Sequence, residues 1–535
     1  MASSALPPSE CDVLVIGTGN AGFSAALSAS EHGAKRVVLI DKCPEEWAGG
    51  NTYFTAGAFR VAHGGLPDLL PLVNNVDAAT AKLIDLAPYT AQHFQDDLMR
   101  VTGGRSDPQL GRTLTGDSYA AAKWLRSLGV RFQLSFNRQA YKVNGRYKFW
   151  GGLYLKTEGG GEGLVEDFRK AARRAGVSIY YSTMAKRLIT DPQTGAVTGV
   201  EVECGSGGVG SRQLHTIRAS AVILAAGGFE ANPRMRAEYL GPGWDLALVR
   251  GTPYNTGDCL RMAIRDVDAK QAGHWSGAHS VAWDANAPPN SGDRAVSNEF
   301  TKSGYPLGVM INTQGERFVD EGVDLRNYTY AKFGRAILGQ PEGQAFQVWD
   351  ARGTPWLRDE EYRDSIVRKI RADSLEELAA QLAAHGLHSP DKFLETMRAY
   401  NRATHAFAAE HPDAKWDPAV KDGVSTQSSS QRLALPKSNW ALPIDQAPFV
   451  AVKVACGVTF TFGGLAVNPE TAAVVSAADR EVPGLYSVGE MLGGLFYGNY
   501  PGGSGLTSGA VFGRRAGRAA ALRAKAATGA IRANL

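Results

Sequence analysis

A glycine-rich turn near the N-terminus constrains this chain more than any other feature. Residues 12–16 form a short apolar run, and the sequence GTGNAG follows at once as residues 17–22. Small residues over 21–32 then predict a helix, and the apolar residues 37–40 predict a second buried strand. A G-x-G-x-x-G spacing between a strand and a helix, with a further strand after it, is typical of a dinucleotide-binding unit.

Each glycine of this turn has its own predicted role. Gly17 makes the tight turn after the strand, Gly19 lets the backbone approach a pyrophosphate, and Gly22 lets helix and strand pack closely. The helix N-terminus then offers free N–H groups and a partial positive charge to the phosphates. Asp41 closes the second strand, close to the spacing expected of a carboxylate that binds ribose hydroxyls. The turn therefore predicts a dinucleotide site, although it does not distinguish FAD from a nicotinamide cofactor.

Composition excludes several kinds of partner. The net charge is only +4 over 535 residues, without long runs of Lys or Arg, so we expect neither a nucleic-acid surface nor a polybasic membrane patch. No stretch reaches the roughly 18 apolar residues that a membrane span needs. The five cysteines are scattered, without the Cys/His spacing of a metal site, so we expect no metal and a reduced, cytoplasmic protein. The C-terminal Ala533-Asn534-Leu535 loosely resembles a peroxisomal address, which is the alternative location.

Other glycine clusters lie far from the first turn. Gly49-Gly50-Asn51-Thr52 and Gly57 come soon after Asp41, and Ala226-Gly227 follows a predicted strand at 221–225. Gly489-Glu490 and a glycine-rich turn at 502–506 lie near the other end of the chain. Together these motifs resemble the flavoprotein subunits of fumarate reductase and succinate dehydrogenase. Within that family they look most like the tricarballylate dehydrogenases, with 3-ketosteroid dehydrogenases as cousins, and the resemblance covers nearly the whole chain.

The resemblance implies an α/β fold, in which a Rossmann-like FAD-binding domain carries an inserted α+β capping domain. We expect the FAD-binding domain at residues 10–268 and 449–535, and the capping domain at 269–448. The helix that begins near Gly505 would point its N-terminus at the flavin, where reduced flavin carries negative charge. The predicted cofactor-binding residues are Gly17, Gly19, Asn20, Ala21, Gly22, Asp41, Lys42, Gly49, Gly50, Asn51, Thr52, Gly57, Ala185, Ala226, Gly227, Asp258, Glu490, Ser504, Gly505 and Leu506.

One difference from the covalent flavoproteins of the family predicts how the flavin is attached. Covalent members of the family carry the flavin on a histidine near the first glycine pair. Here residues 51–55 read NTYFT, without a histidine. We therefore predict that FAD is held without a covalent bond.

Three residues are candidates for catalysis. His279 aligns with a substrate-binding histidine of the fumarate reductases, with His274 as the fallback. Arg326 falls where the family places its catalytic arginine, which delivers a proton opposite the hydride. A guanidinium is essentially always charged, so it donates a proton only beside a forming carbanion, although its charge also stabilises an enolate-like transition state. Tyr500, in a Tyr-Pro-Gly-Gly sequence, resembles the tyrosines of the tricarballylate and ketosteroid branches.

Several family residues are replaced in this chain. By residue counting, Lys302 and Tyr305 stand where the reductases feed their arginine through a glutamate and a second arginine. Phe460 replaces a second substrate histidine, and Tyr500 replaces an arginine that clamps a carboxylate. Fumarate reduction is therefore doubtful.

The sequence thus predicts an FAD-dependent oxidoreductase that acts on a CH–CH group beside a carboxylate or ketone, similar to tricarballylate dehydrogenase. We expect a small-molecule substrate and a separate electron acceptor, because no haem or iron–sulfur ligand set is present. One alternative is a ketosteroid-like or secondary-metabolite enone desaturase or reductase. Two others are a non-catalytic flavin-binding sensor and a nicotinamide enzyme.

Overall fold

The first of two large sheets has a parallel centre. The computed structural model describes residues 6–205, 213–288 and 293–533, so part of the predicted peroxisomal address (residues 534–535) lies outside the described residues. In this sheet β1 (Glu10–Ile16) lies between β2 (Val37–Ile40) and β12 (Gln213–Leu224), and all three run parallel. Strands β1 and β2 are almost continuously apolar because helices cover both faces of such a sheet. The remaining strands are β9 (Ser178–Tyr180), β10 (Thr183–Thr190), β11 (Val197–Cys204), β19 (Ala473–Val475) and β20 (Glu481–Ser487).

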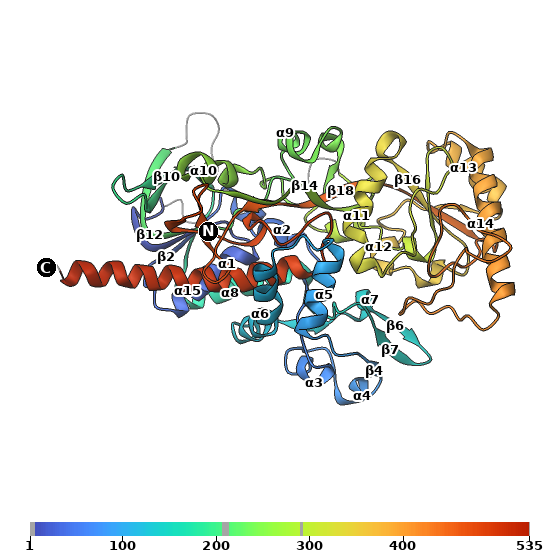
Figure 1. The fold of residues 1–535 in the computed structure, drawn as a ribbon, viewed down its shortest axis with the longest axis horizontal. Helices are drawn as coiled ribbons and strands as arrows, with labels where there is room; N and C mark the ends of the chain where they lie inside the picture. The colour runs from blue at the N-terminus through green and yellow to red at the C-terminus, as the bar shows by residue number, and fades with distance from the viewer. Residues whose placement is uncertain (1–5, 206–212, 289–292, 534–535) are drawn as a thin grey trace.

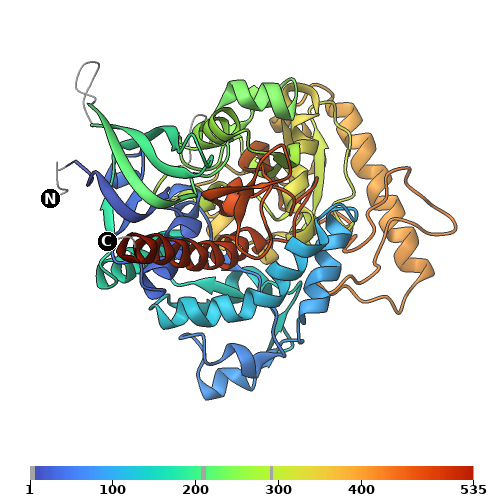
Figure 2. The ribbon, with the colours of Figure 1, turned by 60° about the vertical axis from the view of Figure 1, so that its left-hand side comes forward.

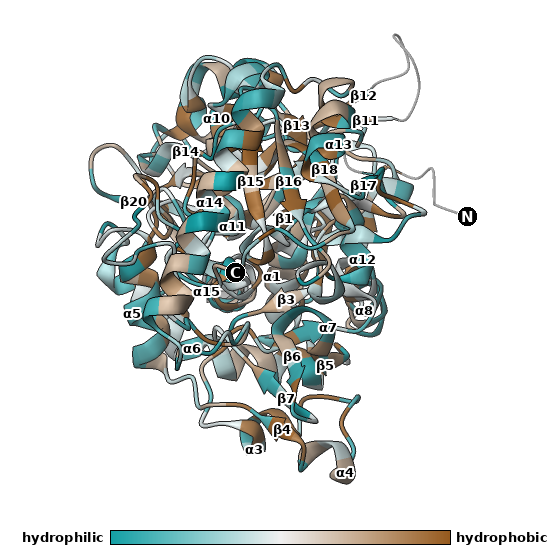
Figure 3. Cartoon of the chain, turned by 90° about the vertical axis from the view of Figure 1, so that its right-hand side faces the viewer, coloured by the Kyte–Doolittle hydropathy of each residue, from teal (hydrophilic) through white to brown (hydrophobic). Residues whose placement is uncertain are grey.

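The second large sheet is built around one long strand, β18 (Phe449–Leu465). Its partners are β13 (Leu248–Val249), β14 (Gln271–Asp284), β16 (Ala345–Trp349) and β17 (Ile370–Ala372), and β15 (Val309–Asn312) pairs with β16. Figure 3 shows β15 and β16 as strongly hydrophobic strands. Figure 1 shows α13 (Leu375–Ala383) and α14 (Pro390–Glu410) at the far side of this part of the molecule. Because β13 and β18 come from outside residues 269–448, this sheet extends across both predicted domain boundaries.

Shorter elements surround the two sheets. Two small sheets contain β3 (Ala58–Phe59), β5 (Phe132–Leu134) and β8 (Leu155–Thr157), and β4 (Ile84–Asp85), β6 (Ala140–Val143) and β7 (Arg146–Phe149). The other α-helices are α2 (Gly50–Tyr53), α3 (Leu66–Leu69), α4 (Ala78–Ala81), α5 (Ala91–Val101), α6 (Pro108–Ser127), α7 (Phe136–Gln139), α8 (Gly160–Arg174), α9 (Pro233–Met235), α10 (Asp258–Val267), α11 (Tyr330–Leu338) and α12 (Asp359–Tyr362). Within the described residues, no helix combines the length and apolarity that a membrane crossing requires.

The two ends of the chain meet where α15 (Ser504–Ala533) packs along α1 (Asn20–Glu31), as Figures 1 and 2 show. Three glycines at four-residue spacing, Gly509, Gly513 and Gly517, form the contact stripe on α15. A Cβ atom on Gly513 would lie 2.7 Å from the carbonyl oxygen of Ala21, and one on Gly517 would lie 2.2 Å from that of Ala25. The glycines therefore allow a close backbone approach that any side chain would prevent.

This approach predicts opposite effects of one substitution at two helical glycines. Gly517→Ala should lower the free energy of unfolding by about 1–3 kcal/mol, because the new methyl group overpacks against α1. Gly116→Ala on α6 should raise it by about 0.5–1 kcal/mol, because no atom lies within 4 Å of the added Cβ and alanine favours a helix. Urea unfolding measures both. Equal effects of the two variants would contradict the proposed close contact.

Candidate active site

The turn between β1 and α1 adopts the conformation that its glycines predict. Gly17 has a φ of +113°, and a Cβ there would lie 2.3 Å from the carbonyl oxygen of Ala225. A Cβ on Gly22 would lie 1.8 Å from the carbonyl oxygen of Gly17, so Gly22 serves the packing of helix on strand. Gly19 precedes α1, and the nearest atom to its added Cβ, Oγ1 of Thr52, is 3.5 Å away. The open side of Gly19 faces a cavity.

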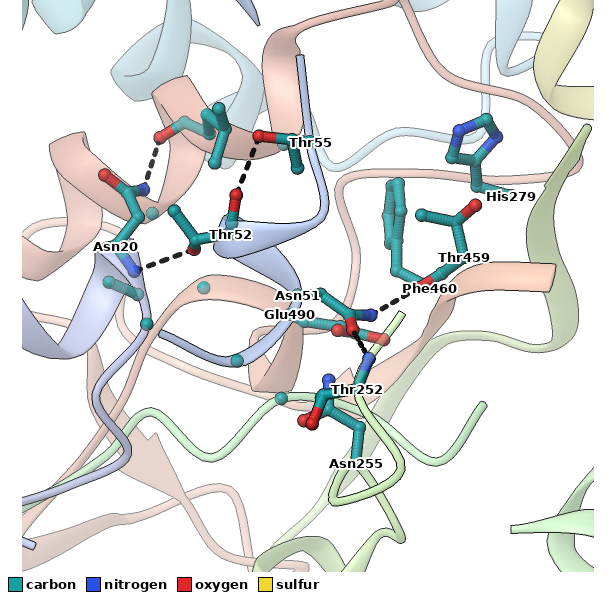
Figure 4. A pocket seen from close by; sticks show the side chains of 18 of the residues that line it. Asn20, Asn51, Thr52, Thr55, Thr252, Asn255, His279, Thr459, Phe460 and Glu490 are labelled. Carbon is teal, nitrogen blue, oxygen red and sulfur yellow. Dashed lines mark hydrogen bonds between the residues drawn. The ribbon is translucent and has the colours of Figure 1, made fainter. Parts of the chain in front are cut away.

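This cavity runs from the turn to the second sheet and has a volume of about 270 Å³. Figure 4 shows side chains around it from α1, from α2, and from β14 and β18 of the second sheet. Most of the predicted cofactor-binding residues line it: Gly17, Gly19, Asn20, Ala21, Asp41, Lys42, Gly50, Asn51, Thr52, Ala185, Ala226, Gly227, Asp258, Glu490, Gly505 and Leu506. The predicted catalytic residues His279, Arg326 and Tyr500 line it as well.

Four predicted cofactor residues are not part of the cavity lining and instead shape the backbone behind it. Gly22 packs against the turn, as described above. Gly49 and Gly57 have φ values of +106° and +68°, which favour glycine. Ser504 donates a hydrogen bond from its hydroxyl to the carbonyl of Pro501 and begins α15.

The cavity suits a long anionic ligand with many hydrogen-bonding groups. The N-termini of α1 and α15 both reach it, and each supplies free N–H groups and a partial positive charge. The side-chain Nδ2 of Asn20 joins the two helices by donating to the carbonyl of Leu506 at 2.8 Å. Oδ1 of Asn20 and the hydroxyl of Ser508 are buried without a hydrogen-bond partner among the described residues. A bound dinucleotide would satisfy such atoms.

Asp41 braces the turn in addition to lining the cavity. Its carboxylate accepts hydrogen bonds from the backbone N–H of Thr18 at 2.8 Å and from the Thr18 hydroxyl at 2.6 Å. The neighbouring Lys42 forms an ion pair with Asp258 at the start of α10. The sequence predicted Asp41, Lys42 and Asp258 as separate ligands, whereas the structure also joins the last two to each other.

A pair of buried carboxyl groups lies beside Asn51. Nδ2 of Asn51 donates to Glu230 and to the carbonyl of Thr459, and Nδ2 of Asn255 donates to Glu230 at 2.6 Å. Burial and the neighbouring Glu490 raise the pKa of Glu230 well above 4.5. Burial also raises the pKa of Glu490. Two such groups cannot both ionise at low cost, so the pair holds a proton to a higher pH than an isolated carboxyl group does. Sequence reasoning missed Glu230, which stands in no recognisable motif.

His279 lies among aromatic rings at the second sheet. It is 2% exposed and pairs in register with Phe460 across β14 and β18. Its ring centroid lies 4.9 Å from that of Tyr330 and 5.0 Å from that of Tyr500. Burial, and then the nearby charge of Arg250, lower the pKa of His279 well below 6.5. His279 is therefore neutral near pH 7, and its Nδ1 has no hydrogen-bond partner among the described residues.

Tyr500 and Tyr330 form a hydrogen-bonded pair with their hydroxyl oxygens 2.6 Å apart. Burial raises the pKa of both phenols, and for Tyr500 the shift is large. Both phenols are therefore protonated near neutral pH. Phe460 and Phe496 pack against Tyr500 with ring centroids 5.0 and 5.4 Å away. These rings give the tyrosine pair an apolar surrounding.

Arg326 reaches the same cavity from a 3-10 turn (Arg326–Tyr328). It is 6% exposed and donates from Nη2 to the carbonyl of Arg138 at 2.8 Å. Its guanidinium carbon lies 4.8 Å from the centroid of the Trp150 ring. Trp150 thus holds the arginine by a cation–π contact on one side. The cavity thereby brings Arg326, His279 and Tyr500 together from segments far apart in the sequence.

The two residues that replace the family's relay to Arg326 form hydrogen bonds with other groups. Lys302 donates to the backbone carbonyl of Glu299, and the Tyr305 hydroxyl lies 2.8 Å from Oγ1 of Thr329. Nδ1 of the fallback His274 accepts a hydrogen bond from the backbone N–H of Gly498.

Several polar cavity residues were not predicted. Among them are Arg138, Arg250, Ser303 and Arg358, together with Thr252 and Thr459. They belong to no motif and gather only through the tertiary fold, so no local sequence signal could have identified them.

The fold and the cavity define a dinucleotide-binding flavoprotein architecture with a second sheet over the ligand site. The family model described as "FAD binding domain" matches residues 12–506. The chain belongs to this family and binds FAD, as the sequence predicted.

Known proteins support the same assignment. "Probable fumarate reductase Ifc3" of Shewanella frigidimarina is 27% identical over 523 residues, with 98% of this chain and 77% of that protein covered. The open conformation of a flavocytochrome c3 fumarate reductase superposes with a TM-score of 0.69 at 25% identity, covering 97% of this chain and 79% of that one. A 3-ketosteroid delta1-dehydrogenase from Sterolibacterium denitrificans shares the fold, with a TM-score of 0.70, 19% identity, and 96% and 100% coverage. The chain is an FAD-dependent oxidoreductase that acts on carbon–carbon bonds.

The Glu230–Glu490 pair predicts a pH dependence of stability. Both pKa values are higher in the folded protein than in the unfolded chain, so the protonated pair stabilises the fold. This stabilisation is complete below the unfolded-state pKa of about 4.5, and it is lost as the pH rises through the folded-state pKa values. Glu230→Gln should therefore flatten the fall in melting temperature on the alkaline side, because an amide cannot ionise. Thermal unfolding as a function of pH measures this effect. Parallel pH curves for the variant and the parent would contradict a shared proton.

Proposed function

We propose that this protein moves a hydride between non-covalently bound FAD and a CH–CH bond next to a carboxylate or ketone of a small organic substrate. The main observation that supports this proposal is that Arg326, His279 and Tyr500 line the same cavity as most of the predicted cofactor-binding residues. FAD supplies the two-electron acceptor or donor when bound.

Side chains of the cavity would stabilise the negative charge on the substrate and supply the proton. The carbon next to a carboxylate or ketone can lose its proton only if the resulting negative charge is stabilised. The charge of Arg326 suits that task, because the side chain is buried and its charge acts strongly on a neighbouring group. The neutral His279 can donate a hydrogen bond to a substrate oxygen. Because both phenols are protonated, one of them can donate its proton to the substrate carbon when the bond is reduced, and the other can stabilise the resulting phenolate through their shared hydrogen bond.

The finer substrate proposal is a compound similar to tricarballylate. Phe460 and Tyr500 stand where the fumarate reductases carry polar clamps, so a high rate of fumarate reduction is not expected. The aromatic wall around Tyr500 favours the rival proposal of a ketosteroid-like or other enone substrate. Stopped-flow reduction of the bound FAD by tricarballylate, succinate and a cyclic ketone separates these possibilities. Bleaching by dithionite but by no organic compound would favour the non-catalytic sensor.

The proposed roles predict a loss of turnover in two variants. Arg326→Gln should lower kcat by about a hundredfold to a thousandfold, because it removes a charge that acts on the transition state. Tyr500→Phe should lower it by about a hundredfold or more, because it removes a proton carrier. Both variants should keep their FAD. Arg402 is exposed on α14, so Arg402→Gln is a matched control that should leave kcat unchanged. Unchanged kcat in both variants would reject this mechanism.

The proposed non-covalent attachment predicts that acid precipitation releases the flavin. Residues 51–55 of the cavity region offer no histidine for a covalent bond. After precipitation with trichloroacetic acid, FAD should appear in the supernatant with its ordinary spectrum. A yellow pellet that keeps its flavin in denaturant would show a covalent link.

A further inference from the structure

Four arginines gather in the part of the cavity that adjoins the tyrosine pair. Arg138, Arg250, Arg326 and Arg358 all line it. They come from α7, from the segment after β13, from the 3-10 turn at 326–328, and from the residue that precedes α12. No family motif assigns a role to three of them.

Two of these arginines are neutralised within the protein. Glu361 is fully buried, and its Oε1 accepts from Arg138 at 3.0 Å and from Arg358 at 2.8 Å. Arg138 also pairs with Glu360. The Arg358 and Arg138 guanidiniums outweigh burial and lower the pKa of Glu361 to about 2, so this carboxylate stays charged.

The other two arginines have only neutral acceptors. Arg250 donates to Oδ1 of Asn298 at 2.9 Å and to Oγ1 of Thr459 at 3.3 Å. Arg326 donates to a backbone carbonyl, as described above. Arg250 is 7% exposed and Arg326 is 6% exposed, and neither forms an ion pair with a carboxylate of the described part of the chain. The Nε atoms of both are buried without an acceptor there.

Glu361 also acts electrostatically on Arg250 and Arg326, but Glu360 and Glu361 together cannot balance four guanidiniums. Buried positive charge that is not balanced is costly, so in a ligand cavity it calls for an anionic ligand. The cofactor diphosphate is poorly placed to supply it, because the phosphate-binding turn around Asn20 lies across the cavity from His279 in Figure 4. Arg250 acts electrostatically on His279, Tyr330 and Tyr500, which puts its charge beside the proposed reaction centre.

We propose that Arg250 and Arg326 together bind a carboxylate of the substrate, so that the substrates of this enzyme are acids. This inference rests on the proposed function and narrows it from a carboxylate or ketone to a compound that carries a carboxylate. Arg250 is then a specificity-determining residue. A neutral steroid would leave both charges without a partner, which disfavours the ketosteroid rival.

Matched pairs of ligands test the proposal on the FAD-loaded full chain. Acrylate is compared with acrylamide, cinnamate with cinnamamide, and tricarballylate with its triamide, so that each pair shares a carbon skeleton. Shifts of the flavin absorption band give the dissociation constants. The acid should bind about tenfold to a hundredfold more tightly than its amide, because a hydrogen bond to a charged group lowers the dissociation constant by about this factor. Equal affinities in every pair, or no binding of any acid up to millimolar concentrations, would overturn the proposal.

Variants then assign the preference to its residue. Arg250→Gln should remove most of the acid preference and Arg250→Lys should keep part of it, while Arg402→Gln should leave it unchanged. An undiminished preference in FAD-loaded Arg250→Gln would overturn the role of Arg250. Turnover is read separately in the same samples. Tighter binding of the acids without any flavin reduction or reoxidation would reject the proposed function but support the carboxylate-binding site. Rapid turnover of neutral enones without tighter binding of the acids would support the proposed function but reject the carboxylate-binding site.

Discussion

The close contact between α1 and α15 is the constraint on which the rest of the site depends. It joins residues from the two ends of the chain, and three glycines on α15 make it possible. The same contact sets the positions of two helix N-termini at one cavity, with Asn20 bonded across to Leu506. Because each N-terminus carries a partial positive charge, their shared direction creates a site for a long anionic cofactor.

The second constraint is the antiparallel pairing of β14 with β18. It puts His279 directly opposite Phe460, whose ring centroid lies 5.0 Å from that of Tyr500. The residue next to Phe460, Thr459, contacts both Asn51 and Arg250. One strand thus connects the cofactor side of the cavity with the proposed substrate side. Its pairing with strands of the predicted capping domain explains why the two parts share a single cavity.

The sequence predicted the fold class and family because these depend on local patterns. The turn at 17–22 needs particular glycines at fixed spacing, and the structure uses Gly17 and Gly22 for the predicted backbone reasons. Glu230, Arg250 and Glu361 could not be found in this way. Each is a single polar residue whose meaning comes from neighbours hundreds of residues distant or from burial. Lys302 and Tyr305 stand at positions where the family carries its proton relay, and their hydrogen bonds go to other groups, a backbone carbonyl and Thr329.

The protonation states in the cavity assign different tasks to residues that looked interchangeable in the sequence. Glu230 and Glu490 hold a proton to a higher pH than isolated carboxyl groups, His279 is neutral, and the two phenols keep their hydrogens. An arginine gives up its proton only with difficulty, so the guanidiniums supply a fixed positive potential. The groups that can exchange a proton near the substrate are then the tyrosines. From this division we infer that Arg326 holds and stabilises negative charge, while the Tyr330–Tyr500 pair carries the proton.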